Sequence, residues 1–481
     1  MVAENRQAAQ KENACLLGKV RLSMSIPRLI VAGVEPGPAV DLVAGALLAG
    51  LGEQRPVRPI LLGLDLPLWR LVYDLSARAP RVLDPMLLSR DAAMELYDRW
   101  AEEMDLVVFV AARPLIESWE GVPGSRPCDL AAAFDAPVIL ALDARDRGAS
   151  AAAVLHGSRA MAGRIEVGGV VAVGGDESPA SIELTEALRR EVDLPLLGRV
   201  PPQLTEQFMR QHVSPGGRVK TVGPGPARGG TAHLCREAAG YVALREVQAL
   251  ARRSGFLPAA PHRLLTLRPN PGQVSVAAAW GPPLQPVALE NVDVLQAMGV
   301  RLVPLNLAKD REVPPDADGL LLLGQLDEQQ IQRFAANRAL LAELRAAVDA
   351  GLPAVAMGGG ALLLLQRLAD SRGRAFDLVG ALPAEAELIE SYDRPVYVTA
   401  TATRQNPFDE GTHELYELFD LEFSLLEQGS FAYQIRTPGG AEQAEGFVIK
   451  RCLATTLYTS FVACPQLATR FVSVMQFLQG H

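Results

Sequence analysis

Apolar positions along the first half of the chain fall into short continuous runs separated by helical patterns. The run Arg28–Gly33 is followed by an Ala/Leu-rich helical stretch, Val40–Gly50. Similar apolar runs follow at residues 105–111, 137–143, 168–173 and 194–200. A strand that is buried on both faces has such a continuous run, and strands that alternate with helices form a parallel sheet. The pattern therefore predicts a doubly wound α/β domain.

The same alternation restarts after a break. Residues 219–230 are rich in Gly and Pro and indicate a loop, and residues 231–254 have the periodicity of one amphipathic helix. Further apolar strands are expected at residues 274–279, 302–305, 319–323 and 354–357. β-type runs and a closing helix are expected at residues 397–401, 431–436, 446–450 and 464–479. A second α/β domain with a β-rich end is the consequence.

These breaks predict four parts. Residues 1–26 form a mobile N-terminal extension, residues 27–255 the first domain, residues 256–263 a linker and residues 264–481 the second domain. A length of 481 residues suits two or three domains, and a hydrophobic content of 49% allows large cores.

Composition narrows the function classes. The net charge of -9 disfavours a nucleic-acid surface, and no run of about eighteen apolar residues predicts a membrane span. Five scattered cysteines without CxxC spacing indicate a reducing cytoplasm, and six histidines without metal-like spacing predict no metal site.

Four sequence blocks, taken in order, resemble the cobyrinate a,c-diamide synthase family. They are RVLDPMLLS (81–89), LPLLGRVP (194–201), the block from Val313 to Leu341 and the block from Ala444 to Val472. The resemblance implies an ATP-dependent synthetase domain with a P-loop-like doubly wound parallel sheet, followed by a class I glutamine-amidotransferase-like α/β domain. Enzymes of this family amidate corrin carboxylates with ammonia that they release from glutamine.

The phosphate loop that the resemblance implies has lost its chemistry. A P-loop needs GxxxxGK[ST] between a strand and a helix. The matching residues begin at Gly33 and continue through Gly37, with Val40 at the Lys position and Asp41 at the Thr position. Pro36 and Pro38 remove amide donors, and Glu35 adds negative charge. Gly63 and Asp65 of a second phosphate-side element remain. We therefore expect no use of ATP-Mg²⁺.

The implied glutaminase site is degenerate as well. A strand ending at Met357 leads into a nucleophile elbow and a helix over residues 361–370, but Gly358 stands at the nucleophile position. Tyr458 and Ser460 stand where the resemblance places the histidine bases. Gly324 and Glu328 persist as remnants of the oxyanion side, and Cys452 and Cys464 are interpreted as small buried residues. We expect no catalytic residue and no glutamine hydrolysis.

A further block, around His413, corresponds to a segment that helps to form the substrate cleft in the family that the chain resembles. In the segment around His413, Glu422 and Phe423 match the family, whereas the histidines that flank them there are missing. The motif therefore leaves the binding of a corrin open.

Three hypotheses follow. In the first, the chain is a catalytically inactive homologue, a binding, scaffold or accessory protein for a tetrapyrrole-like ligand or a partner protein. In the second, amidation in cobalamin or sirohaem metabolism continues with displaced catalytic residues. In the third, the chain is a structural subunit of a larger complex. The oligomeric state stays open, with a dimer as one option.

Overall fold

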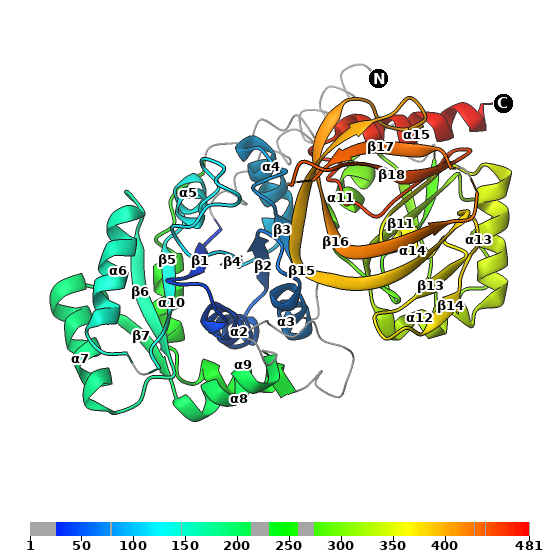
Figure 1. Ribbon diagram of the computed structural model, residues 1–481. Helices are drawn as coiled ribbons and strands as arrows, with labels where there is room; N and C mark the ends of the chain where they lie inside the picture. The colour runs from blue at the N-terminus through cyan, green and yellow to red at the C-terminus, as the bar shows by residue number, and fades with distance from the viewer. Residues whose placement is uncertain are drawn as a thin grey trace, which may run out of the picture. The chain divides into compact units, whose positions relative to one another are not determined.

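A computed structural model describes residues 26–76, 79–145, 147–212, 230–257, 274–427, 429–437 and 439–480. These residues form two compact units, unit 1 before residue 258 and unit 2 after residue 273 (Figure 1). Nearly all of the predicted extension (1–26) and most of the predicted linker (256–263) lie outside the described residues, as does most of the predicted loop 219–230. The domain boundaries therefore stay predictions.

Unit 1 contains a sheet of seven described strands in the order β3-β2-β4-β1-β5-β6-β7. Every pairing in it is parallel, as the alternating pattern predicts. The central strands are buried on both faces, which explains their continuous apolar sequence. The strands are β1 Arg28–Gly33, β2 Val57–Leu62, β3 Arg81–Leu83, β4 Leu106–Ala111, β5 Val138–Asp143, β6 Val167–Val173 and β7 Leu196–Val200.

Helices cover both faces of this sheet (Figure 1). On one face, Tyr97 of α4 and Phe134 at the end of α5 contact Phe109 of β4, with ring centroids 5.8 and 4.8 Å apart. Helix α2 is buried from Ala39 to Leu51 and packs against α3 and α9. The helices are α2 Ala39–Gly52, α3 Leu66–Ser76, α4 Arg90–Ala101, α5 Pro127–Ala133, α6 Ser150–Met161, α7 Pro179–Ala187, the π-helical turn η1 Leu188–Val192, α8 Pro202–His212, α9 Gly230–Ala239 and α10 Leu244–Ala251.

The prediction of one helix over residues 231–254 is wrong. The structure has two helices, because the backbone between α9 and α10 pairs with the edge strand β7. Arg199 N–H donates to the Tyr241 carbonyl, and Ala243 N–H donates to the Leu197 carbonyl at 2.7 Å. These pairings require extended backbone and interrupt the helix.

Unit 2 contains a mixed sheet in the order β10-β8-β11-β12-β19-β18-β17-β15-β13-β14, with β16 paired to β15 and β9 to β11. The strands from β10 to β19 run parallel, and those from β19 to β16 run antiparallel. The strands are β8 Ser275–Ala279, β9 Leu284–Gln285, β10 Arg301–Pro304, β11 Gly319–Leu326, β12 Ala354–Gly358, β13 Arg367–Ala369, β14 Ala375–Asp377, β15 Ala384–Ala402, β16 Thr412–Leu425, β17 Phe431–Arg436, β18 Glu442–Ile449 and β19 Cys452–Thr455.

The helices of unit 2 are α11 Glu290–Ala297, α12 Glu328–Ala335, α13 Arg338–Ala350, α14 Gly359–Leu362 and α15 Pro465–Gln479. Helix α14 is far shorter than the predicted helix 361–370. It ends early because the carbonyls of residues 363–366 accept hydrogen bonds from the amides of residues 378, 379, 380 and 382 rather than from the next turn. Strands β15 and β16 form a long ribbon, of which the sequence pattern predicts only residues 397–401 (Figure 1).

Among the described helices, none combines the length and the apolar character that crossing a membrane requires.

Candidate functional site

The elbow after β12 has the backbone shape that a nucleophile position requires. Strand β12 ends at Gly358, whose φ of 58° and ψ of -124° lie in a region that side chains rarely adopt, and α14 starts at the next residue. Glycine takes this conformation without steric cost. The elbow that the resemblance implies is therefore present, and Gly358 occupies it.

The phenol of Tyr458 fills the space that a side chain at residue 358 would need. A Cβ atom built on Gly358 would lie 1.9 Å from Cζ and 2.0 Å from the hydroxyl oxygen of Tyr458. Tyr458 is fully buried and stacks on Tyr416, with ring centroids 5.2 Å apart. A cysteine at 358 and a tyrosine at 458 cannot coexist in this geometry. Glycine and tyrosine are a matched pair here.

The Tyr458 hydroxyl forms hydrogen bonds with polar groups at the elbow. It accepts a hydrogen bond from Gly359 N–H at 3.3 Å, the amide next to the nucleophile position. Its single hydrogen has two acceptors within reach, the Gly324 carbonyl at 2.9 Å and Gln325 Oε1 at 2.8 Å. Burial raises the pKa of Tyr458 well above its usual value, so the phenol stays neutral. A neutral phenol of this kind is a poor general base.

Ser460 has a structural position. It is buried, its hydroxyl accepts a hydrogen bond from Val462 N–H at 3.3 Å, and its carbonyl accepts one from Cys464 N–H. The loop around it is held by the buried Asn291, whose amide donates to the Thr459 carbonyl and accepts from Phe461 N–H. These contacts account for Ser460 without a role in catalysis.

The two oxyanion-side remnants hold backbone in place. Gly324 has a φ of 142°, and a Cβ atom there would lie 2.3 Å from the Gln285 carbonyl oxygen of β9. Glu328 accepts hydrogen bonds from the amide and the hydroxyl of Ser371, at 3.0 and 2.6 Å. The close approach of β9 therefore requires a glycine at residue 324. Glu328 connects the start of α12 to the turn at Ser371 through these hydrogen bonds.

The loop between β1 and α2 offers few amide donors. Val34 N–H donates to the Ala141 carbonyl at 3.1 Å, and Pro36 and Pro38 carry no N–H. The exposed Glu35 carboxylate forms an ion pair with Arg147. Gly33 and Gly37 retain the glycine positions of a phosphate loop, and Val40 is largely buried where a lysine would reach forward. The loop presents neither a lysine nor a hydroxyl at the two positions that would bind a nucleotide and its metal.

Asp41, at the position of the metal-binding hydroxyl, is buried and paired. Its Oδ2 lies 2.7 Å from Nε2 of His212 at the end of α8, and both side chains are less than a tenth exposed. Phe208 packs beside the imidazole, with ring centroids 4.7 Å apart. The Asp41 carboxylate therefore points into the protein and contacts a histidine instead of facing the loop. The two residues are 171 positions apart, so the sequence does not reveal this contact.

Gly63 and Asp65, the retained residues of the second phosphate-side element, have local structural roles. Gly63 has a φ of 79°, and a Cβ atom there would lie 2.3 Å from the Trp119 ring. Asp65 accepts a hydrogen bond from Leu68 N–H at 3.1 Å at the start of α3, as helix-capping residues do. Their presence is explained without a nucleotide.

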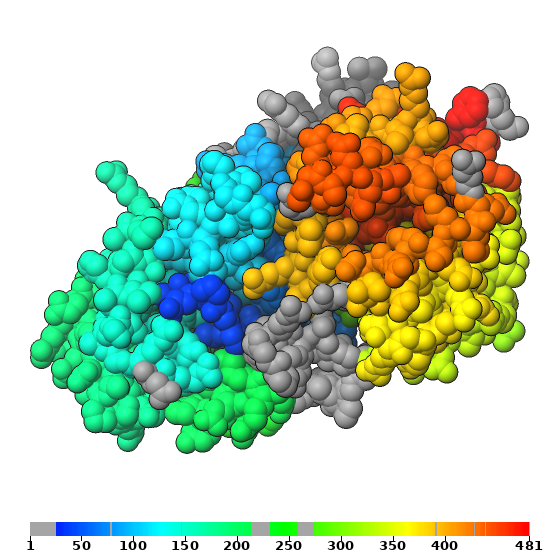
Figure 2. Space-filling model, in the orientation of Figure 1, coloured from blue at the N-terminus to red at the C-terminus, as the bar shows by residue number. Residues whose placement is uncertain are grey.

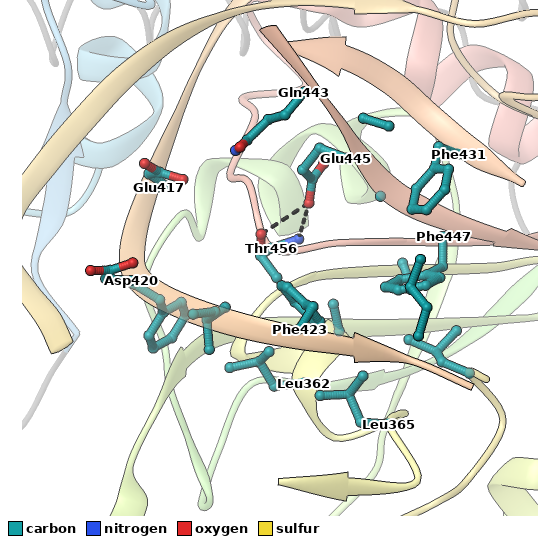
Figure 3. A pocket seen from close by; sticks show the side chains of 18 residues that line it. Leu362, Leu365, Glu417, Asp420, Phe423, Phe431, Gln443, Glu445, Phe447 and Thr456 are labelled. Carbon is teal, nitrogen blue, oxygen red and sulfur yellow. Dashed lines mark hydrogen bonds between the residues drawn. The ribbon is translucent and has the colours of Figure 1, made fainter. Parts of the chain in front are cut away.

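Two features of unit 2 were not found by sequence reasoning. One is a pocket of about 350 Å³ beside the elbow helix, whose walls include Leu362 of α14 and Glu417 of β16 (Figure 3). The other is a Cys–His–Asp cluster. His413 Nε2 lies 3.0 Å from Asp409 Oδ1, and the carboxylate and the thiol of the buried Cys464 raise the pKa of His413 to about 10. Asp409 and His413 lie four residues apart, whereas Cys464 comes from a distant segment, so spacing alone gives no signal for the cluster.

Among the described residues, no group of three or more His, Cys, Asp or Glu side chains could hold a metal ion.

Known proteins resemble the chain over most of its length. A family model of the CobB/CobQ-like glutamine amidotransferase domain matches residues 278–463. The cobyrinate a,c-diamide synthase of Caldanaerobacter subterraneus subsp. tengcongensis is 22% identical over 451 residues, which cover 92% of this chain and 97% of the relative. That of Magnetococcus marinus is 26% identical, over 87% of this chain and 90% of the relative.

The same enzyme of Dehalococcoides mccartyi is 23% identical, over 94% of this chain and 98% of the relative. Among solved structures, a glutamine amidotransferase covers 42% of this chain and 98% of its own, with a TM-score of 0.32 and 15% identity. The chain is therefore a homologue of cobyrinate a,c-diamide synthases over most of its length, at 22–26% identity, and residues 278–463 match the CobB/CobQ-like glutamine amidotransferase domain.

Proposed function

We propose that this homologue does not catalyse glutamine-dependent amidation and acts instead as a binding or accessory protein. The observation that carries the proposal is the phenol of Tyr458, which lies where the side chain of a nucleophile at residue 358 would have to be. The same hydroxyl accepts the hydrogen bond of Gly359 N–H, which therefore does not point at a substrate oxygen. The Tyr458 side chain thus occupies the space of the nucleophile and also takes the hydrogen bond of an amide that could stabilise an oxyanion.

The nucleotide side supports the same proposal independently. Binding of a triphosphate relies on amide donors, a lysine and a metal-holding hydroxyl. This loop has two prolines, Val40 and the buried Asp41 at the corresponding positions. A hydrogen bond to a charged group contributes about 1.5–3 kcal/mol, so the loss of several weakens nucleotide binding by several powers of ten.

The test measures both half-reactions on the full chain. Glutamate release from glutamine and ADP release from ATP-Mg²⁺ are expected to stay at the level of a buffer blank. Isothermal titration is expected to show no heat of binding for either compound. Turnover above the blank, or micromolar affinity for ATP-Mg²⁺, contradicts the proposal.

A second candidate function, glutamine hydrolysis by a displaced nucleophile, is favoured by one observation. Cys464 lies at the N-terminus of the fifteen-residue helix α15 and interacts with His413, which is paired to Asp409. A thiol, an imidazole and a carboxylate in series are the groups of a cysteine hydrolase. If the candidate is correct, glutamate release is measurable and Cys464→Ala abolishes it. Cys452→Ala, which removes another buried thiol of unit 2, is the matched control.

A further inference from the structure

The pocket beside the elbow helix has a charged end and an apolar end. The carboxylates of Glu417 and Asp420 lie at one end, and the rings of Phe431 and Phe447 lie at the other (Figure 3). Strands β16, β17 and β18 provide these side chains, and Leu362 and Leu365 form the floor. A ligand that fits must therefore have two chemically different ends.

The apolar end is built from aromatic rings in contact. The ring centroid of Phe447 lies 5.6 Å from that of Phe431 and 6.0 Å from that of Phe423. Part of this wall is open to solvent, since Phe423 is 38% exposed. Ring faces of this kind bind apolar groups and also attract cations.

The charged end carries three carboxylates, those of Glu417, Asp420 and Glu445. Glu445 accepts hydrogen bonds from Thr455 Oγ1, Thr456 N–H and Thr456 Oγ1 at 2.6–2.9 Å, which fix its position. Burial and the charges of Glu445 and Asp420 raise the pKa of Glu417 to about 7. None of the 18 residues that line the pocket is Lys, Arg or His. No cationic side chain of the pocket wall therefore offsets the repulsion among these carboxylates.

We propose that this pocket binds a small amphipathic organic cation, a protonated amine or a quaternary ammonium group on an apolar or aromatic body. The cationic end lies between Glu417, Asp420 and Glu445, and the body lies on the phenylalanine rings. The inference deepens the proposed binding role, on which it rests, by naming the ligand class.

Two other ligand classes fit less well. A compound that carries carboxylates, as the tetrapyrrole precursors of the family's reaction do, would meet negative charge with no basic side chain to receive it. A bare metal ion needs several converging oxygen or nitrogen ligands, whereas leucine and phenylalanine side chains line much of this pocket. The segregation of charge and rings favours an amphipathic cation over both.

The test compares three probes of one shape on the full chain. They are 4-phenylbutyl-trimethylammonium, 4-phenylbutanol and 4-phenylbutyrate, titrated calorimetrically at pH 8, where Glu417 is ionised. The cation is expected to bind at least about tenfold more tightly than the alcohol, because its charge is attracted by the carboxylates and by the ring faces. The carboxylate is expected not to bind.

Two variants and one control variant locate the site. Glu417→Gln is expected to weaken binding of the cation about tenfold, because one carboxylate charge is lost, and to leave binding of the alcohol unchanged. Glu422→Gln is the matched control, since it removes the same charge from the same strand outside the pocket, and it is expected to change neither probe. Phe423→Leu, at a partly exposed position, is expected to weaken both the cation and the alcohol.

Three outcomes in which binding is detected overturn the inference. They are equal affinity for the three probes, tighter binding of the carboxylate, and a cation affinity that Glu417→Gln and Glu422→Gln change alike. Absence of any binding at millimolar concentration also overturns it. Glutamine and ATP turnover are measured on the same samples, so an active enzyme with no cation site and an inactive protein with one are separate results.

Discussion

At the residue scale, Tyr458 connects three segments of unit 2 that are distant in the sequence. Its hydroxyl lies between the end of β11 at Gly324, the side chain of Gln325 and the first amide of α14. Its backbone pairs with Tyr416 of β16 in both directions. A side chain in that position contributes to stability as well as filling the elbow.

Removing the hydroxyl alone should expose this contribution. Tyr458→Phe keeps the ring but leaves Gly359 N–H and the Gly324 carbonyl buried without their partner. An unsatisfied buried polar group costs about 1–3 kcal/mol, so the free energy of unfolding of unit 2 is expected to fall by that amount in urea denaturation. Tyr433→Phe, which removes another buried hydroxyl paired to Asp409, calibrates the size of the effect. An unchanged midpoint for Tyr458→Phe contradicts the role.

Glu417 gives a pH dependence of stability with a defined sign. Its pKa is raised from 4.5 to about 7 in the folded protein, chiefly by burial and then by Glu445 and Asp420. The folded state therefore holds this proton at a pH where the unfolded state has released it. Stability from this group is largest below pH 4.5 and declines as the pH rises through 7.

The measurement is the urea midpoint of the full chain between pH 5 and pH 8. Wild type is expected to lose stability over this range, and Glu417→Gln is expected to reduce that loss. Glu422→Gln, outside the pocket, is the control and should keep the wild-type slope. A Glu417→Gln slope equal to that of wild type contradicts the assignment.

The sequence identified each changed residue at the two implied sites, but it did not predict which side chains these residues contact. Gly358, Tyr458, Val40 and Asp41 are all visible as departures from the family pattern. The Tyr458 ring occupies the space that a side chain at residue 358 would need, and Asp41 pairs with His212. Both contacts join segments more than 90 residues apart in the sequence. Periodicity and spacing carry no information at that range.

At the element scale, α2 and α8 are joined by the pair of Asp41 and His212. Helix α2 is otherwise apolar and buried over nearly its whole length, and His212 is the one side-chain hydrogen-bond partner of this carboxylate among the described residues. A buried carboxylate that loses its partner is strongly destabilising.

His212→Ala is expected to lower the free energy of unfolding of unit 1 by about 3–5 kcal/mol. His156→Ala, at an exposed position on α6 of the same unit, is expected to change it by less than about 0.5 kcal/mol. Chemical denaturation followed by circular dichroism measures both. Similar losses for the two variants contradict the importance of the pair.

The alternation of apolar runs and helical patterns predicted the parallel sheet of unit 1 because those strands are buried on both faces. It failed where backbone pairing overrides helix periodicity, at the break between α9 and α10 and after the elbow. It also missed most of β15 and β16, because their buried residues, such as Leu415 and Phe419, are interrupted by charged ones and form no continuous apolar run.

At the scale of the whole molecule, two compact units with separate cores predict two unfolding events. Differential scanning calorimetry of the full chain is expected to resolve two transitions. His212→Ala should lower one of them, and Tyr458→Phe should lower the other. A single transition that both variants shift equally contradicts independent units.

Because the Tyr458 ring fills the space of a side chain at residue 358, the order of substitutions that could restore a nucleophile is constrained. A first step from Gly358 to cysteine places a Cβ atom 1.9 Å from Cζ of Tyr458, and a first step from Tyr458 to histidine removes part of the ring that stacks on Tyr416. Both intermediates are expected to fold less well than their endpoints. Selection acting one substitution at a time therefore faces a barrier, so the glycine and the tyrosine keep each other in place.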